Sequence, residues 1–500
     1  MSQDSAQRQW RTRRGGTLLP SRLSQIVVST VLPLACLCAS AHAESTPEGR
    51  TYSPYQEAQP VLQALRPLVP SELGADPNAW AQAWPAWTAQ SDQAIRARLA
   101  QGDEDSLVHL LLFGTTFTEQ PRVTHKQIEA MNAQAAGNPA AASAGINSII
   151  RARLDDFVAA LAHPGTNERL LFARDMLVTR KGYRLESTEG RNQVRQDLAA
   201  MITRVLRLAQ NYEQIAQRAQ LLGGSKDELE AVERAKLFAA RGLSSDTSLR
   251  PNFAIEEALK TLRDQGIIKH VRRVAIIGPG LDFIDKQEGY DFYPQQTIQP
   301  FAIVDTLLRL GLANANDLQV TTLDLSTKVN AHIARAKADA QRGASYAIQL
   351  PLAMDEVWKP GFWSYWEAFG NQIGTPVPPV PLPAKVASLK MRAVSVRPQI
   401  GAMLTPTDVN IVLQRLELPA AEKFDLMIGT NIFVYYNAFE QGLALQNMAY
   451  MLKPGGVLLS NTALSEVPAA RMKLLGSTTV VYSDRRDDGD VLRWYQRQQG

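Results

Sequence analysis

Cysteine is almost absent from this chain, whose 500 residues include only Cys36 and Cys38. Both lie close to the N-terminus, within a segment that shows the features of a cleaved signal. The chain that remains after cleavage would hold no cysteine, which excludes disulfide bonds and thiol chemistry.

Patterns for binding phosphates and metals are also lacking. The sequence has no GKS or GKT phosphate loop, and a dinucleotide fingerprint would need a third glycine where Phe283 stands. The histidines beyond residue 43 show no metal-ligand spacing, so we expect no metal site. These histidines are His109, His125, His163, His270 and His332.

An excess of one charge is lacking once the N-terminus is set aside. The whole chain has 53 basic and 49 acidic residues, a formal net charge of +4. Residues 1–43 contain five arginines and one aspartate, so the rest of the chain has 48 residues of each sign. A neutral chain gives no electrostatic reason to bind nucleic acid or an anionic membrane, and we expect neither as a partner.

The first 43 residues are typical of a signal peptide. A basic region leads into an apolar run, Ile26 to Ala39, and then into Ala41-His42-Ala43. Small residues at 41 and 43 favour cleavage after Ala43. The run is short for crossing ~30 Å of hydrocarbon, which disfavours the alternative of a membrane anchor. We therefore predict an exported protein, periplasmic or secreted, with no stable membrane span. Thr12 to Gly16 also resembles a twin-arginine signal, a second route of export.

Residues 44–265 have the periodicity of a helical domain. Trp80, Trp84 and Trp87 share one helical face, and packing is the predicted use of that stripe rather than a ligand site. Leu243 to Phe253 has the composition of a polar linker.

From about residue 266 the pattern changes to alternating strands and helices, which indicates a parallel sheet in an α/β domain at 266–500. Four apolar residues, Val274 to Ile277, lead into Gly278-Pro279-Gly280 and predict a buried first strand with a tight turn. Further strands are expected at 318–323, 345–350, 389–396, 424–428, 456–460, 478–482 and 490–495. Helices are expected at 299–312, 331–342, 407–416 and 438–451.

Four pieces of this half occur in a telling order. The glycine turn is followed by Asp324 at a strand end, by FDLMIGTNIFVYY at 424–436 and by LKPGGVLL at 452–459. This arrangement resembles the class I S-adenosylmethionine-dependent methyltransferases, and most closely their chemotaxis-receptor branch. The resemblance implies a doubly wound, seven-stranded, Rossmann-like sheet that ends in an antiparallel hairpin, with LKPGG as the turn into the fifth strand.

The resemblance also implies roles for particular residues. Gly278 and Gly280 would let the backbone approach the methionine part of S-adenosylmethionine, and Asp324 would accept both ribose hydroxyls. Asn431 would face the cofactor and the acceptor. Tyr435, with its neighbour Tyr436, would shape the acceptor cavity or pack against the following helix.

The glycine turn departs from the family pattern at two positions. Ile276 stands where the family usually has an acid, and Asp282 stands where it has a third glycine. We hypothesise that Asp282 replaces the acid in binding the cofactor's amino group. A base, if one is needed, would come from Asp282, Tyr290, Asp291 or Tyr435. The loop at 285–300 is either a lid or acceptor-recognition element or a plain surface excursion.

Two functions remain open at this point. The first is methyl transfer from S-adenosylmethionine to an unknown small-molecule or protein acceptor. The second is an exported, non-catalytic binding or interaction protein that retains the methyltransferase-like fold. Export works against the first, because this cofactor is made in the cytoplasm. The departures at Ile276 and Asp282 favour the second, whereas Asp324 and Asn431 favour the first.

Overall fold

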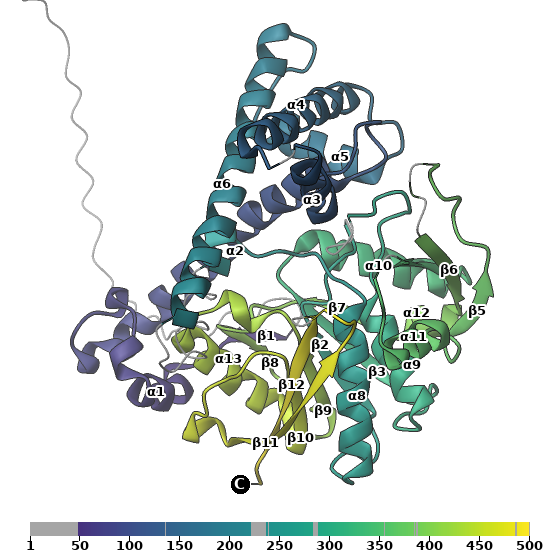
Figure 1. The fold of residues 1–500 in the computed structure, drawn as a ribbon. Coiled ribbons are helices and arrows are strands. Elements are labelled where there is room, and N and C mark those ends of the chain that lie inside the picture. Colours follow the sequence, from purple (N-terminus) through teal and green to yellow (C-terminus); the bar gives the residue numbers. More distant parts are fainter. Residues whose placement is uncertain are drawn as a thin grey trace, which may run out of the picture. The chain divides into compact units, whose positions relative to one another are not determined.

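Seven strands form the central sheet of the computed structural model (Figure 1). The strands lie in the order β11-β12-β10-β9-β2-β3-β7. Their bounds are β2 Arg273–Ile277, β3 Gln319–Asp324, β7 Leu404–Asp408, β9 Phe424–Gly429, β10 Leu452–Ser460, β11 Met472–Val481 and β12 Gly489–Arg497.

The direction of the strands defines the topology. Strand β2 pairs in parallel with β3 and β9. The sheet then continues in parallel from β3 to β7 on one side and from β9 to β10 on the other. Strand β12 runs antiparallel to both β10 and β11. The sheet is therefore doubly wound, as predicted, and β12 is the strand that opposes the other six.

The structure describes residues 49–135, 137–221, 237–238, 240–283, 289–354, 356–384, 386, 389–485 and 488–499. The predicted signal peptide at 1–43 lies outside the described residues, so cleavage and export stay predictions. None of the helices that the structure describes is long and apolar enough to span a bilayer.

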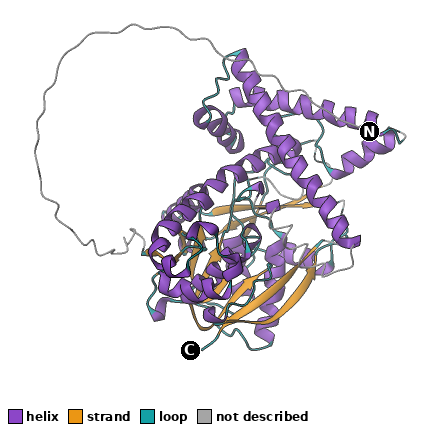
Figure 2. Ribbon diagram, turned by 90° about the vertical axis from the view of Figure 1, so that its left-hand side faces the viewer, coloured by secondary structure: helices purple, strands orange, loops and turns teal. Residues whose placement is uncertain are grey.

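Alternate residues of the central strands enter two different cores. Val274 and Ile276 face one core, which α8, α9 and α10 complete, and Ala275 and Ile277 face the other, which α1, α2 and α13 complete. Burial on both faces explains why Val274 to Ile277 of β2 form a continuous apolar run. Figure 2 shows these strands in orange among the purple helices. The bounds are α1 Tyr55–Ala64, α2 Trp80–Phe113, α8 Arg250–Asp264, α9 Gln299–Arg309, α10 Thr327–Gln341 and α13 Ala438–Met451.

The prediction of a helix at 407–416 was wrong. Residues 404–408 form β7, the edge strand of the main sheet, and Gln414–Leu416 form β8, which pairs with β1, Arg50–Tyr52. Pro406 lies inside β7, where an edge position tolerates the missing N–H. Strand β1 also shows that the segment predicted to be helical begins with a strand.

Two predicted strands belong to a second sheet. Strand β6, Leu389–Val396, pairs antiparallel with β4, Tyr346–Ala353, and with β5, Gly374–Val377. Helices α11, Pro360–Ala368, and α12, Pro398–Ala402, flank these strands in sequence. Single-turn 3₁₀ segments occur at Arg66–Leu68, Ser71–Leu73, Pro77–Ala79, Ala420–Glu422, Phe433–Tyr435 and Pro468–Ala470.

The N-terminal half is mostly helical, and the tryptophan stripe packs as predicted. Trp84 stacks on Trp87 at 5.0 Å between ring centroids, and Trp87 meets Phe439 of α13 at 5.9 Å. The second half of α2 packs with α4, α5 and α6 in a separate apolar cluster. The helices not yet given are α3 His125–Gln134, α4 Pro139–Ala162, α5 Glu168–Arg174, a π-helical turn Asp175–Arg180, and α6 Thr188–Leu221. The predicted division between residues 265 and 266 stays a prediction.

Candidate functional site

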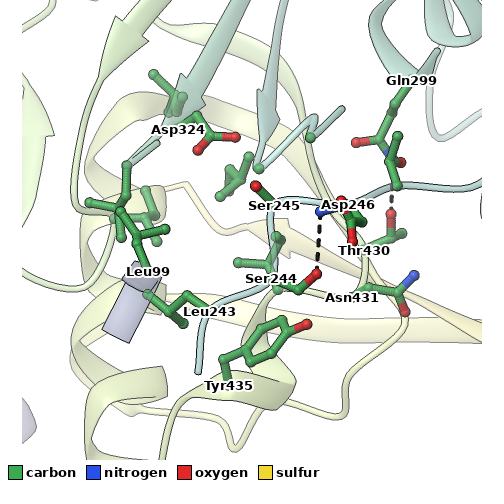
Figure 3. Close-up of a pocket in the computed structure, with 18 of the residues that line it drawn as sticks. Leu99, Leu243, Ser244, Ser245, Asp246, Gln299, Asp324, Thr430, Asn431 and Tyr435 are labelled. Carbon is green, nitrogen blue, oxygen red and sulfur yellow. Dashed lines mark hydrogen bonds between the residues drawn. The ribbon is translucent and has the colours of Figure 1, made fainter. Parts of the chain in front are cut away.

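A cavity lies where β2, β3, β7 and β9 end (Figure 3). The carboxyl ends of parallel strands meet at one edge of a sheet, which is where ligands bind in doubly wound folds. Its empty volume, including the part open to solvent, is about 820 Å³. The strand ends contribute Ile277, Gly278, Gly280, Leu323, Asp324, Leu325, Val409, Ile411, Thr430, Asn431, Ile432, Tyr435 and Tyr436.

The glycine turn is tight, as predicted, but the chain itself fills the space beside it. Gly278 and Gly280 have φ angles of 62° and 66°, values that residues other than glycine rarely adopt. A Cβ on Gly278 would lie 2.1 Å from Cδ1 of Ile432, and a Cβ on Gly280 would lie 2.7 Å from the carbonyl oxygen of Ser245. Both glycines line the cavity, yet close packing of protein against protein already requires them.

Residues Leu243 to Thr247, here called the strap, form a wall of the cavity that sequence analysis did not foresee. The Leu281 amide donates to the Ser245 carbonyl at 2.7 Å, and the Thr247 amide donates to the Leu281 carbonyl at 3.0 Å. The Leu243 amide donates to the backbone carbonyl of Arg98, in α2, at 3.0 Å. The predicted polar linker therefore begins with a segment fixed against both the glycine turn and the helical half, and no local sequence signal marks that contact.

Asp324 lies at the end of β3 with its side chain facing the cavity (Figure 3). Its Oδ1 accepts a hydrogen bond from the Ser326 amide at 2.8 Å, and the residue is 8% exposed. Burial raises the pKa of this carboxyl from 3.8 to about 6, against the lowering effects of the Ser326 and Gly280 amides and of Lys328. A carboxylate so placed keeps acceptor positions for hydroxyl groups of a ligand.

Asn431 and Tyr435 also line the cavity. Asn431 adopts a φ of 60°, a conformation that asparagine tolerates better than most residues. Its side-chain Oδ1 accepts from Asn461 Nδ2 at 2.7 Å, and its backbone N–H donates to Asn461 Oδ1 at 2.8 Å. These two hydrogen bonds join the ends of β9 and β10. The Tyr435 ring lies edge-on to Phe238 at 5.3 Å. The roles predicted for both residues stay predictions.

Gln299, the first residue of α9, is a member of the lining that sequence analysis missed. Its Nε2 donates to Thr430 Oγ1 at 3.0 Å, and its buried Oε1 has no hydrogen-bond partner among the described residues. A glutamine at a helix start carries no distinguishing sequence signal, so only the assembled fold reveals it.

Asp282 does not line the cavity. Its Oδ2 accepts from the Tyr293 hydroxyl at 2.8 Å and from Gln296 Nε2 at 2.9 Å. Arg169 of α5 donates to the backbone carbonyls of Phe283 and Tyr293, so the helical half holds this loop. The structure thus places Asp282 in the support of the glycine turn, outside the cavity lining.

Tyr290 and Asp291 also lie outside the cavity lining. Asp291 is buried and accepts hydrogen bonds from the amides and hydroxyls of Thr115 and Thr116. Tyr290 is buried beneath the guanidinium of Arg122, 5.0 Å from the ring centroid. The described part of this loop is therefore an anchor to the helical half, and not the surface excursion that was one of its two interpretations.

Comparison with known proteins adds little to this geometry. No protein-family model and no curated protein matches the chain. Among solved structures it is similar to the N-methyltransferase NodS from Bradyrhizobium japonicum WM9, with 12% identity over 49% of this chain and 97% of that one, at a TM-score of 0.24. It is also similar to magnesium protoporphyrin IX methyltransferase from Synechocystis PCC 6803, with 9% identity over 53% and 84% of the two chains, at a TM-score of 0.24.

A third similar structure is an S-adenosylmethionine-dependent methyltransferase from Clostridium acetobutylicum ATCC 824, with 7% identity over 50% and 93% of the two chains and a TM-score of 0.25. Likeness at this level carries no functional argument. The order of the seven strands, with β12 reversed, is what gives this chain the class I methyltransferase fold. The chemotaxis-receptor branch stays a prediction.

Proposed function

We propose that this protein binds S-adenosylmethionine and transfers its methyl group to an acceptor that is still unidentified. The observation that carries the proposal is Asp324, a buried carboxylate at the end of β3 that faces the cavity beside the glycine turn. A carboxylate in this position suits the two hydroxyls of a ribose.

The rest of the lining fits the parts of that cofactor. Strand pairing places Asp324 opposite Asp408, so Leu325 and Val409 continue side by side beyond the strand ends, and Ile411 follows. This apolar edge next to the ribose acceptor suits adenine. Hydroxyl and amide groups on the β9 side, including Thr430 and Asn431, suit the amino-acid part.

The charge of the cavity also supports a cationic ligand. Its described lining contains two carboxylates, Asp246 and Asp324, and no lysine, arginine or histidine. S-adenosylmethionine carries a sulfonium, an ammonium and a carboxylate, so it has one net positive charge. Carboxylates in a lining without basic side chains favour such a ligand over a neutral or anionic one.

When bound, the cofactor would supply an electrophilic methyl group. The contribution of this chain is to bind and align the two reactants, which is a proximity effect. Burial raises the pKa of Tyr436 far above its ordinary value, so its hydroxyl stays protonated at neutral pH and is no base.

One observation favours the second candidate, an exported binding protein without catalysis. Asp282, Tyr290 and Asp291, three of the four residues considered as bases, support the loop instead of lining the cavity. Export after cleavage at Ala43 is part of either proposal, as is a helical domain at 44–265.

Calorimetric titration of the purified chain with S-adenosylmethionine and S-adenosylhomocysteine tests the proposal. We expect micromolar binding that is lost in Asp324→Ala and kept in Asp339→Ala, a control at an exposed acid of α10. The absence of binding to a folded chain contradicts the proposal. Binding without methyl transfer to any acceptor in a broad screen supports the non-catalytic candidate.

A further inference from the structure

The cavity holds a buried hydrogen-bond acceptor that the fold itself does not use. Gln299 is 3% exposed, and its Oε1 has no partner among the described residues. Leaving such an atom unpaired costs about 1–3 kcal/mol, so native proteins seldom bury one without a reason. An unpaired acceptor in the lining of a ligand cavity is explained if the bound ligand supplies the missing hydrogen-bond donor.

The amide of Gln299 is held in one place. Its Nε2 donates to Thr430 Oγ1 at 3.0 Å, which joins the start of α9 to the end of β9. Figure 3 shows Gln299 next to Thr430, across the cavity from Asp324. The acceptor therefore lies at the end of the cavity that is opposite the proposed ribose site.

Resting on the proposed function, we propose that Gln299 Oε1 accepts a hydrogen bond from the ammonium group of bound S-adenosylmethionine. The cofactor has three kinds of donor: the ribose hydroxyls, the adenine amino group and the ammonium. Asp324 takes the first, and the apolar edge beyond β3 and β7 receives the adenine. The ammonium is the donor left for the far end.

The surroundings agree with a positive charge at this point. Asp246 of the strap lies in the same lining, and its carboxylate accepts a hydrogen bond from the Ser106 hydroxyl of α2 at 2.7 Å. Ile276 cannot serve the ammonium, and Asp282 is bonded to Tyr293 and Gln296 outside the lining. Gln299 thus takes over a task for which the glycine turn of this chain has no acid.

The orientation of the amide decides the chemistry. If the oxygen faces the cavity, it accepts from the ammonium. If the amide were reversed, its nitrogen would donate to the cofactor's carboxylate instead. Gln299→Glu separates these cases, because glutamate keeps the shape and offers acceptors alone.

The test is calorimetric titration of the full chain with two ligands, S-adenosylhomocysteine and 5′-methylthioadenosine. Both contain the adenosine part, but methylthioadenosine has no amino-acid part. We expect Gln299→Leu to weaken binding of S-adenosylhomocysteine at least tenfold and to leave methylthioadenosine within twofold. Gln299→Glu should bind S-adenosylhomocysteine at least as tightly as the unmodified chain. Gln372→Leu, at an exposed glutamine, is the matched control and should change neither.

Four results would overturn the inference. Equal weakening of both ligands by Gln299→Leu would mean that the residue only shapes the cavity. Loss of S-adenosylhomocysteine binding in Gln299→Glu would place the amide nitrogen, not the oxygen, at the ligand. If the unmodified chain binds neither ligand, the proposed function fails and this inference fails with it. If it binds both but Gln299→Leu changes nothing, only this inference fails.

Discussion

Two buried aspartates, in two regions of the molecule, are held in opposite ways. Asp291, in the loop anchored to the helical half, accepts four hydrogen bonds at 2.6–3.3 Å from Thr115 and Thr116. Asp324, at the end of β3, is held by backbone amides of Ser326 and Gly280 and faces the cavity. A carboxylate saturated by its own protein stabilises the fold, whereas one with acceptor positions to spare can serve a ligand.

The largest effect is expected from Asp291→Ala. Two buried donors of Thr115 and two partly buried donors of Thr116 would lose their acceptor, and we expect the free energy of unfolding to fall by about 4 kcal/mol. Urea unfolding followed by circular dichroism measures this change. Asp339→Ala, at an exposed site, should change stability by less than about 0.5 kcal/mol. A loss of similar size in the two variants would remove the distinction between a saturated and an exposed carboxylate.

Asp324→Asn should have the opposite effect on stability. Because the pKa of Asp324 in the folded protein is raised from 3.8 to about 6, its contribution to stability is complete below about pH 3.8 and is lost as pH rises through 6. Asparagine never ionises and still accepts from the Ser326 amide. We expect the variant to be up to about 3 kcal/mol more stable than the unmodified chain at pH 8, with the difference shrinking toward pH 4.

Ligand binding should follow the reverse course with pH. The ionised form of Asp324 is the one that accepts two hydroxyls, so binding of S-adenosylhomocysteine should tighten as pH rises through 6. Calorimetry at pH 5 and pH 7.5 measures this shift, and Asp324→Asn should abolish it together with most of the affinity. A variant that binds normally, or that is less stable at pH 8, would contradict the contrast between the two aspartates.

The smallest effects are expected at the glycine turn. Gly280→Ala should destabilise the protein by about 2 kcal/mol, because both the positive φ and the Ser245 carbonyl oppose a side chain. Gly278→Ala meets a flexible side chain, Ile432, and should cost about 1 kcal/mol. A second change, Ile432→Ala, should recover part of the loss at 278 and none at 280. Thermal melting of the single and double variants measures the coupling; equal rescue at both positions would contradict it.

The sequence predicted those features of the fold and the site that depend on residues adjacent in the chain. Strands β2, β3, β9 and β10 are rich in apolar residues, and Gly278, Asp324 and Asn431 follow or end those strands. Their shared edge could therefore be deduced before the fold was seen. Strand β7 was not foreseen, and its last two residues were included in the helix predicted at 407–416. Its Pro406 and its apolar spacing fit neither pattern well, and only its place at the edge of the sheet explains the proline.

The rest depends on contacts between distant segments. No local pattern reveals that the strap lies along Leu281, or that Thr115 and Thr116 surround Asp291. The same holds for Gln299, whose amide becomes notable only when Thr430 lies beside it. Asp282 and Asp291 looked alike in sequence, as acids near a glycine turn, and the assembled protein gives both to the support of the loop.

The strap has a consequence for how this protein can change over generations. Leu99 and the strap form one wall of the cavity, so a chain starting at residue 267 would retain the glycine turn, Asp324 and Asn431 but leave that side open to water. The α/β half alone therefore does not form the complete cavity, and it cannot be transferred to another protein as a functional domain. Substitutions in the strap and in the glycine turn fall under one selection, and the two segments should vary together among the descendants of this chain.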